Sequence, residues 1–270
     1  MKKIIFITGI SSGFGRETAK LLSERGHRVY GTTRRDCEVP SGIKVLRLDL
    51  TDDRSLKDAV KSVVEEERRI DVLINNAGMH TGGAIEMAPA GHIKLQMDTN
   101  FMGTVLLTRE VLPYMRDQGG GMIINMSSIG GLMGLPFQGF YSAAKFATEG
   151  FSEALRMEVR KFKIKVIVIN PGDFNTNNSA NRRKFLSPVI ENDPYREQFE
   201  KTLRVIEKDE GNGRDPEILA KKILKIVECK NPKQRYIIAS PDQKLAVLLK
   251  YILPSPWFGK IIESHYKIIS

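Results

Sequence analysis

The chain has 270 residues, 41% of them hydrophobic and 27% charged, and its net charge of +10 is scattered in short runs without a nucleic-acid-binding motif. Two distant cysteines and four histidines without metal-ligand spacing argue against a disulfide framework and a metal site, and they fit a reducing compartment. No apolar stretch approaches the roughly 20 residues of a membrane span, and the N-terminal apolar run is too short for a signal peptide, so we expect a cytoplasmic protein.

Short runs rich in β-branched residues alternate with longer segments of helical periodicity. We expect strands at 4–8, 28–33, 44–48, 72–75, 122–127, 165–170 and 235–239. We expect helices at about 14–25, 53–68, 92–117, 139–162 and 215–229. This alternation predicts an α/β fold, a doubly wound (Rossmann) parallel sheet of about seven strands with helices on both faces. No linker or repeat interrupts it, so we expect a single domain over 1–270.

Two stretches depart from the alternation. Residues 174–212 are polar and turn-rich, and we expect a mobile helical flap there. Residues 241–270 form an apolar tail with leucines at helical spacing, followed by Trp257 and Phe258. Two interpretations of the tail stay open: it packs on the core or on a second subunit, or it offers an apolar surface that guards a substrate or touches a membrane.

The first expected strand ends in a glycine-rich turn, and a helix follows. Backbone N–H groups in such a turn can approach a pyrophosphate, and the helix dipole favours its negative charge. The spacing G-x-x-x-G-x-G differs from the commoner G-x-G-x-x-G, but its position after the first strand of a βαβ unit indicates a dinucleotide site. The residues expected to form it are Gly9, Ser11, Ser12, Gly13, Phe14 and Gly15.

The end of the second strand distinguishes between the two nicotinamide dinucleotides. A carboxylate there would bind a ribose 2′-hydroxyl and repel a 2′-phosphate. Thr33 and Arg34 stand at this point instead, and arginine pairs with phosphate bidentately. NADP(H) is therefore favoured, while the nearby Asp36 leaves NAD(H) open.

Tyr141 and Lys145 are four residues apart in a helical pattern, so their side chains share one helix face. A lysine ammonium about 4 Å from a phenol contributes about 4 kcal/mol at an effective dielectric near 20, which lowers the pKa of the phenol by up to about three units. We therefore expect Tyr141 to act as an acid/base near neutral pH. Ser128 ends a buried strand and is expected to offer its hydroxyl to the reacting oxygen.

With these residues in place, the sequence resembles the short-chain dehydrogenase/reductase family over at least residues 3–177. Gly9, Gly13 and Gly15 match its cofactor loop. The other matching segments are Asp49-Leu50 at the adenine, Asn75-Asn76-Ala77-Gly78 after the fourth strand, Asn100, and Pro171-Gly172 with Thr176 at the nicotinamide carboxamide.

The resemblance implies a catalytic set of Asn100, Ser128, Tyr141 and Lys145. In that set, Lys145 also holds the nicotinamide ribose, and Asn100 positions a water that links Lys145 to solvent. Hydride moves between the nicotinamide and the substrate carbon while Tyr141 exchanges a proton with the oxygen. The resemblance further implies a homodimer or homotetramer built on the helices at 92–117 and 139–162.

Within the family, the stretch from Ser128 to Phe137 resembles the hydroxysteroid and retinol dehydrogenase-like branch. Met133, Leu135, Phe137 and Phe174 would then line an apolar pocket, or alternatively serve as core or dimer contacts. The expected function is an NADP(H)-dependent oxidoreductase that acts on a carbonyl or alcohol carbon of a lipophilic small molecule. An NAD-dependent alcohol dehydrogenase and a non-catalytic dinucleotide-binding sensor are the alternatives.

Overall fold

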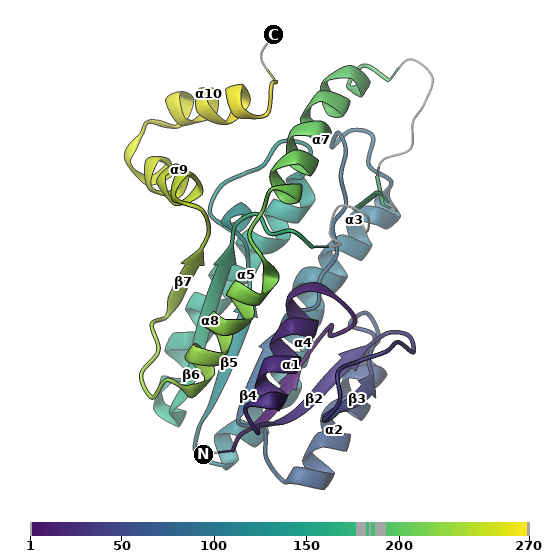
Figure 1. The fold of residues 1–270 in the computed structure, drawn as a ribbon, viewed down its shortest axis with the longest axis vertical. Coiled ribbons are helices and arrows are strands. Elements are labelled where there is room, and N and C mark those ends of the chain that lie inside the picture. Colours follow the sequence, from purple (N-terminus) through teal and green to yellow (C-terminus); the bar gives the residue numbers. More distant parts are fainter. Residues whose placement is uncertain (1, 177–181, 184, 187–192, 269–270) are drawn as a thin grey trace.

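Seven parallel strands form one sheet in the computed structural model, which describes residues 2–176, 182–183, 185–186 and 193–268 (Figure 1). The strand order is β3-β2-β1-β4-β5-β6-β7, so the chain reverses direction across the sheet after β3. This arrangement confirms the expected doubly wound topology. The strands are β1 (Ile4–Ile7), β2 (Arg28–Thr33), β3 (Ile43–Arg47), β4 (Val72–Asn75), β5 (Gly121–Met126), β6 (Ile164–Pro171) and β7 (Arg235–Ile238).

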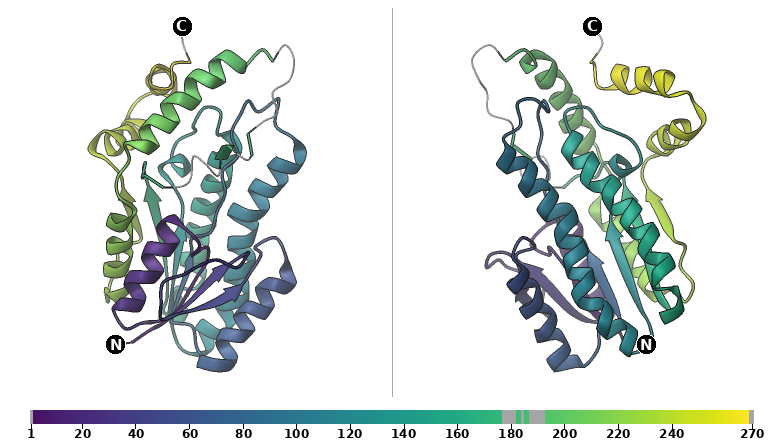
Figure 2. Two further views of the ribbon diagram at one scale, coloured as in Figure 1. Left: turned by 45° about the vertical axis from the view of Figure 1, so that its right-hand side comes forward. Right: turned by 180° about the vertical axis from the view of Figure 1, so that it is seen from behind.

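Helices cover both faces of the sheet (Figure 2). On one face lie α1 (Gly13–Glu24) and α8 (Pro216–Glu228); on the other lie α2 (Asp53–Glu67), α4 (Gly103–Asp117) and α5 (Gly139–Glu158). Because successive strand residues point to opposite faces, Ile5 and Ile7 pack with α1 and α8, whereas Phe6 packs with α2 and α4. Both faces are buried, which explains why the central strands are continuous apolar runs.

The helix expected at 92–117 is interrupted. It consists of α3 (Ala90–Met97), a π-helical turn η1 (Asp98–Met102) and α4. The turn is closed by the backbone N–H of Gly103, which donates to the carbonyl of Asp98. A single wide turn leaves the apolar periodicity of the flanking helices almost unchanged, so the sequence pattern did not reveal it. Such turns occur frequently at functional sites.

Three more helices extend beyond the carboxyl edge of the sheet (Figures 1 and 2). Helix α7 (Arg196–Gly211) lies in the expected flap at 174–212, of which 177–181, 184 and 187–192 are outside the described residues. Helices α9 (Pro241–Ile252) and α10 (Ser255–His265) form the tail. Pro254 and Pro256 separate them, because proline begins a helix more readily than it continues one. Among the described residues, no helix is long and apolar enough to cross a membrane.

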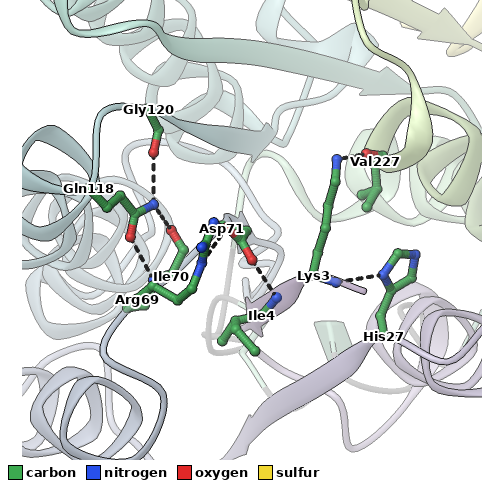
Figure 3. A network of polar contacts seen from close by, with 9 residues as sticks. All are labelled: Lys3, Ile4, His27, Arg69, Ile70, Asp71, Gln118, Gly120 and Val227. Atoms are coloured by element: carbon green, nitrogen blue, oxygen red, sulfur yellow. Dashed lines mark hydrogen bonds and ion pairs between the residues drawn. The ribbon is translucent and has the colours of Figure 1, made fainter. Parts of the chain in front are cut away.

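Side chains bind the backbone at the amino edge of the sheet (Figure 3). The carboxylate of Asp71 accepts from the backbone N–H of Ile4 at 2.8 Å and from Nε of Arg69 at 2.9 Å. Gln118 accepts from the backbone N–H of Ile70 at 3.1 Å and donates to the carbonyl of Gly120 at 2.7 Å. These contacts fix β1, β4 and β5 relative to one another at the edge opposite the glycine-rich turn.

Replacement of Asp71 by alanine is expected to lower the free energy of unfolding by about 1–3 kcal/mol, because the partly buried N–H of Ile4 loses its partner. Urea unfolding followed by circular dichroism measures the change. Asp58→Ala is the control: its side chain is 70% exposed and 3.9 Å from Arg54, so we expect less than about 0.5 kcal/mol. Equal effects of the two substitutions would contradict the assigned role of Asp71.

Candidate active site

The glycine-rich turn between β1 and α1 packs its backbone directly against the segment after β4. A Cβ at Gly9, whose φ is +71°, would lie 2.8 Å from Cα of Ala77. A Cβ at Gly15 would lie 2.1 Å from the carbonyl oxygen of Gly9. Only glycine fits at these two positions, and the turn therefore presents backbone without side chains.

Asn76 holds the turn in this shape. Its Nδ2 donates to the carbonyls of Thr8 at 2.8 Å and Gly9 at 3.1 Å. In return, the hydroxyl of Thr8 accepts from the backbone N–H groups of Asn76 at 3.0 Å and Ala77 at 2.9 Å. The structure thus brings the segment that matches the family after the fourth strand into direct contact with the glycine-rich turn.

The segment after β6 lies beside the same turn. A Cβ built at Gly13 would lie 3.8 Å from Cβ of Thr176. The ring of Phe14 packs edge-on against Phe174 with 5.0 Å between centroids. Ser12 precedes α1 in an extended conformation and makes no side-chain capping bond, and no acidic residue occupies the first turn of α1. This helix N-terminus is therefore suited to an anionic ligand.

Arg34 follows β2 and Asp49 follows β3, and the charge of Arg34 acts on the Asp49 carboxylate. Burial alone would raise the pKa of Asp49, but hydrogen bonds from the backbone and hydroxyl of Thr51 (2.9 and 2.7 Å) and the charge of Arg34 hold it below its ordinary value. Thr33 and Leu50 are buried next to them, while Arg34 is exposed. An exposed guanidinium therefore stands beside a carboxylate at this corner of the site.

Ser128, Tyr141 and Lys145 come together at the carboxyl end of β5. Ser128 begins the short helix η2 (Ile129–Gly131), and its hydroxyl accepts from the backbone N–H of Gly130 at 3.0 Å. Ser128 and Tyr141 both lie against Gly130: a Cβ built there would be 3.5 Å from Oγ of Ser128 and 3.3 Å from Cε1 of Tyr141. Nζ of Lys145, one turn further along α5, lies 5.7 Å from the centroid of the Tyr141 ring and donates to the carbonyl of Met126 at 2.7 Å.

The electrostatics of this group differ from the sequence-based expectation. Burial raises the pKa of Tyr141 to about 12; the hydrogen bond to Ser128 opposes this shift, and Lys145 is not among its causes. Burial also lowers the pKa of Lys145 to about 8, with Glu149 acting in the opposite direction. The prediction that Lys145 makes Tyr141 acidic near neutral pH is therefore wrong for this structure, because the ammonium binds a carbonyl and desolvation exceeds its attraction.

Asn100 lies in the π-helical turn η1 and binds the backbone of one residue. Its Oδ1 accepts from the N–H of Met79 at 2.7 Å, and its Nδ2 donates to the carbonyl of Met79 at 2.8 Å. Gly78 packs against the same amide, since a Cβ there would lie 3.3 Å from Oδ1 of Asn100. The side chain thus fixes the segment after Asn76 and Ala77, and its part in a water relay stays a prediction.

The sequence analysis missed a group of charged and aromatic side chains in contact with Tyr141. The ring of His80 lies against the Tyr141 ring with 3.5 Å between centroids. Nη2 of Arg182 lies 3.2 Å from Nδ1 of His80, and Nη1 donates to Glu210 at 3.1 Å. Arg182 is only 1% exposed. Because His80, Arg182 and Glu210 come from three distant segments, no local motif marks them.

The four apolar residues expected to line a pocket divide into two kinds. Met133 and Phe174 are buried in the core. Met133 packs with Val247 and Phe258 of the tail, and Phe174 belongs to the cluster on the face of the sheet that α1 and α8 cover. Leu135 lies next to Tyr141 and Gly130, and the ring of Phe137 contacts Phe199 of α7 with 5.3 Å between centroids. Leu135 and Phe137 remain the candidates for a substrate wall.

Comparison with known proteins identifies the family to which this fold and this group of side chains belong. The family model for short chain dehydrogenases matches residues 3–187. A 3-ketodihydrosphingosine reductase of Bacteroides thetaiotaomicron is 48% identical over 267 residues, which are 98% of each chain. An NADPH-dependent 3-dehydrocapnine reductase of Ornithobacterium rhinotracheale is 28% identical over 274 residues, which cover 97% of this chain and 96% of the relative.

A solved structure of a short-chain dehydrogenase from Streptomyces avermitilis superposes with a TM-score of 0.79 at 30% sequence identity, covering 93% of this chain and 92% of that one. The chain therefore belongs to the short-chain dehydrogenase family of oxidoreductases, whose fold binds a nicotinamide dinucleotide.

Proposed function

We propose that this protein uses NADPH to reduce the ketone of a long-chain lipid, with Tyr141 as the proton donor. The observation that carries the proposal is the placement of Ser128, Tyr141 and Lys145 together at the sheet edge that also bears the glycine-rich turn. Hydride transfer to a carbonyl needs a dinucleotide site and a proton donor at one place, and these side chains meet that requirement.

A nicotinamide dinucleotide fits the chain's own residues. The turn at Gly9, Gly13 and Gly15 leaves its backbone open for a pyrophosphate, and α1 begins there without an acidic side chain. When bound, the nicotinamide ring supplies the hydride. We assign the remaining contacts to Ser11, Ser12, Phe14, Thr33, Arg34, Asp49, Leu50, Asn76, Ala77, Gly78, Lys145, Pro171, Gly172 and Thr176.

Arg34 supports the choice of NADP(H) over NAD(H). It is exposed at the end of β2, where a carboxylate would be expected in an NAD-specific site, and its charge reaches Asp49. The relative from Ornithobacterium is described as NADPH-dependent, which agrees with this assignment. Asp36 is also exposed after β2, but Arg34 and not Asp36 is the residue that directly follows the strand.

The raised pKa of Tyr141 keeps the phenol protonated at neutral pH, as its role as proton donor in reduction requires. A phenol with a pKa of about 12 is protonated at neutral pH and is ready to donate. An alkoxide that develops on a reduced ketone is a stronger base than a phenolate, so the transfer from Tyr141 is favourable. Ser128 orients the phenol through its hydroxyl, and Lys145, with a pKa of about 8, can return a proton to it.

The substrate assignment rests on the relative from Bacteroides, whose name gives 3-ketodihydrosphingosine as its substrate. Identity of 48% over nearly the whole of both chains includes the loop after Ser128 and the tail. We propose the same kind of substrate here, a ketone on a long alkyl chain. Leu135 beside Tyr141 and Phe137 against α7 would contact the alkyl chain near the reacting carbon.

The charge of Asp173, which follows β6, acts on Tyr141 and raises the pKa of the phenol. Burial, followed by the charges of Glu210 and Asp209, raises the pKa of Asp173 to about 6. Nε2 of Gln243 in α9 donates to this carboxyl group at 2.5 Å. A carboxyl group with this pKa changes its charge within the physiological pH range.

We further propose a homodimer or homotetramer that uses the outer side of α4 and α5. Tyr114 of α4 and Phe146 and Met157 of α5 are exposed there, between 38% and 70% of each residue, and the exposed Met102 directly precedes α4. Exposed apolar side chains on two adjacent helices are typical of subunit contacts.

Tyr141→Phe is expected to lower kcat for ketone reduction by about 10²–10⁴-fold while NADPH binding is retained, because only the proton donor is lost. NADPH oxidation at 340 nm with 3-ketodihydrosphingosine measures kcat, and a fluorescence titration measures binding. Tyr236→Phe, in β7 and outside the catalytic group, is the matched control and keeps full activity. A Tyr141→Phe variant that stays within a few-fold of wild type would refute the assignment.

Arg34→Ala is expected to weaken NADPH binding by about 10–100-fold and to leave NADH binding almost unchanged, since a charged hydrogen bond to phosphate contributes about 1.5–3 kcal/mol. Titration calorimetry with both cofactors measures the difference. Arg54→Ala removes an exposed arginine on α2 and serves as the control. Equal affinities of the wild type for NADPH and NADH would defeat the assignment to Arg34.

Asp173→Asn is expected to change how stability depends on pH. The wild-type carboxyl group keeps its proton up to about pH 6 when folded but ionises at ordinary pKa when unfolded. The contribution of this carboxyl group to the free energy of unfolding is therefore fully present below pH 4. It is lost as the pH rises through 6, and the loss is at most about 3 kcal/mol. The free energies of unfolding of wild type and variant are measured by urea unfolding between pH 4 and 7. We expect the variant to become more stable relative to wild type as the pH rises. Parallel curves would show that Asp173 titrates normally.

A further inference from the structure

Apolar side chains are concentrated on the outer side of the tail. Of the thirteen exposed large hydrophobic residues among those described, six lie between 245 and 261. We name them together the tail face: Leu245, Leu248, Tyr251, Ile252, Trp257 and Ile261, exposed by 53, 53, 70, 65, 67 and 41%. Trp257 is the only tryptophan of the chain. Such a concentration marks an interaction surface.

The tail face is separate from the side on which the tail packs. Leu245, Leu248 and Ile252 share one side of α9 by their spacing, and Trp257 and Ile261 share one side of α10. The opposite sides contribute Val247 and Phe258, both 4% exposed, to a cluster with Ile129, Leu132 and Met133. The tail thus already has a buried side, and the tail face is additional apolar surface.

Lysines outnumber acidic residues in the tail. Between 241 and 268, the tail carries Lys244, Lys250, Lys260 and Lys267 against two acidic residues, Asp242 and Glu263. Lysine stems lie along apolar surface while their ammonium groups reach anionic head groups. Trp257 and Tyr251 are of the type that collects at membrane interfaces. This combination fits an anionic lipid surface better than a second copy, whose tail face would bring lysines opposite lysines.

The position of the tail links this surface to the active site. Val247 and Phe258 pack on the loop that begins at Ser128, and Leu135 of that loop lies beside Tyr141. Helix α10 is joined to α7 by His265 and Asp209 (3.0 Å). The tail therefore stands at the carboxyl edge of the sheet, at the end of the molecule that holds the site (Figures 1 and 2).

We propose that the tail face docks on an anionic lipid bilayer and holds the active site next to the membrane from which its substrate leaves. The role in substrate transfer rests on the proposed function, whereas docking itself does not. Helices α9 and α10 lie in the interface on their apolar sides, as short amphipathic helices do, without crossing the membrane.

Vesicle binding by the full-length protein tests the docking. We expect wild type to cosediment with vesicles that contain phosphatidylglycerol and to show a blue shift of Trp257 fluorescence, with far weaker binding to pure phosphatidylcholine. The double variant Leu248→Glu/Ile252→Glu is expected to lose at least about tenfold in binding, because charged side chains are excluded from the apolar layer. Ile218→Glu, at an exposed position of α8, is the matched control and binds like wild type.

The lysines are tested separately. Lys244→Gln and Lys260→Gln are each expected to weaken binding to the anionic vesicles by about fivefold, because one basic residue near such a surface contributes about that factor. Binding of wild type to both kinds of vesicle with equal strength would contradict the electrostatic part of the proposal.

Two measurements separate this proposal from its alternatives. NADPH oxidation with a short water-soluble ketone is expected to be equal in wild type and the double variant, whereas a long-chain ketone in vesicles is reduced several-fold more slowly by the variant. Vesicle binding without reduction of any ketone would refute the proposed function and support docking. Reduction without vesicle binding would refute docking. Docking would also be refuted if wild type did not bind vesicles and light scattering showed an oligomer for wild type but a monomer for the double variant. The tail face would then join two copies of the chain.

Discussion

The close contact between the glycine-rich turn and the segment after β4 is the constraint on which the site depends. Gly9 and Gly15 have no room for a Cβ, so the backbone of β1 can approach Ala77 closely enough for Asn76 to bind it. This contact fixes where α1 begins and hence where its N-terminal N–H groups point. A side chain at either glycine would separate two neighbouring strands at the edge that binds the cofactor.

The same contact extends toward the catalytic side. The chain runs from Asn76 and Ala77 to Met79, whose backbone is bound on both sides by Asn100. Asn100 lies in the π-helical turn that precedes α4, so the turn sets the position of this side chain. Hydrogen bonds from the side chains of Asn76 and Asn100 to the backbone therefore hold residues 76–79 between the cofactor turn and the helix layer. Asn100 acts here as a clamp on the backbone.

Burial governs the chemistry of Tyr141 and Lys145. An ammonium near a phenol was expected to lower the pKa of the phenol by up to about three units, which requires that the ammonium face the oxygen. Lys145 instead donates to the carbonyl of Met126, and both groups lose the solvation of their charged forms. The phenol therefore keeps its proton and the lysine readily gives one up. That arrangement suits the donation of a proton to a new alkoxide, which is the direction of reduction.

The fold was predictable from the sequence to within one or two residues at most strand ends, because strands buried on both faces form continuous apolar runs. The positions of Ser128, Tyr141 and Lys145 were predictable as well, since spacing along one strand and one helix determines them. The contact of His80 with Arg182 was not, because it joins segments about a hundred residues apart. The pKa of Tyr141 was misjudged because a sequence pattern reports neighbours but not the depth of burial.

The tail shows how the two kinds of information combine. Its periodic leucines indicated a helix with one apolar side, and either a packed tail or an exposed apolar surface was compatible with that pattern. The structure shows that Val247 and Phe258 satisfy the packing while Leu248 and Trp257 remain outside it, so both interpretations apply to different sides of the same helices. A tail with two apolar sides costs solubility unless the outer side has a partner. The partner we propose is an anionic lipid bilayer, which would also hold the long-chain ketone that we propose as the substrate, one loop away from the site.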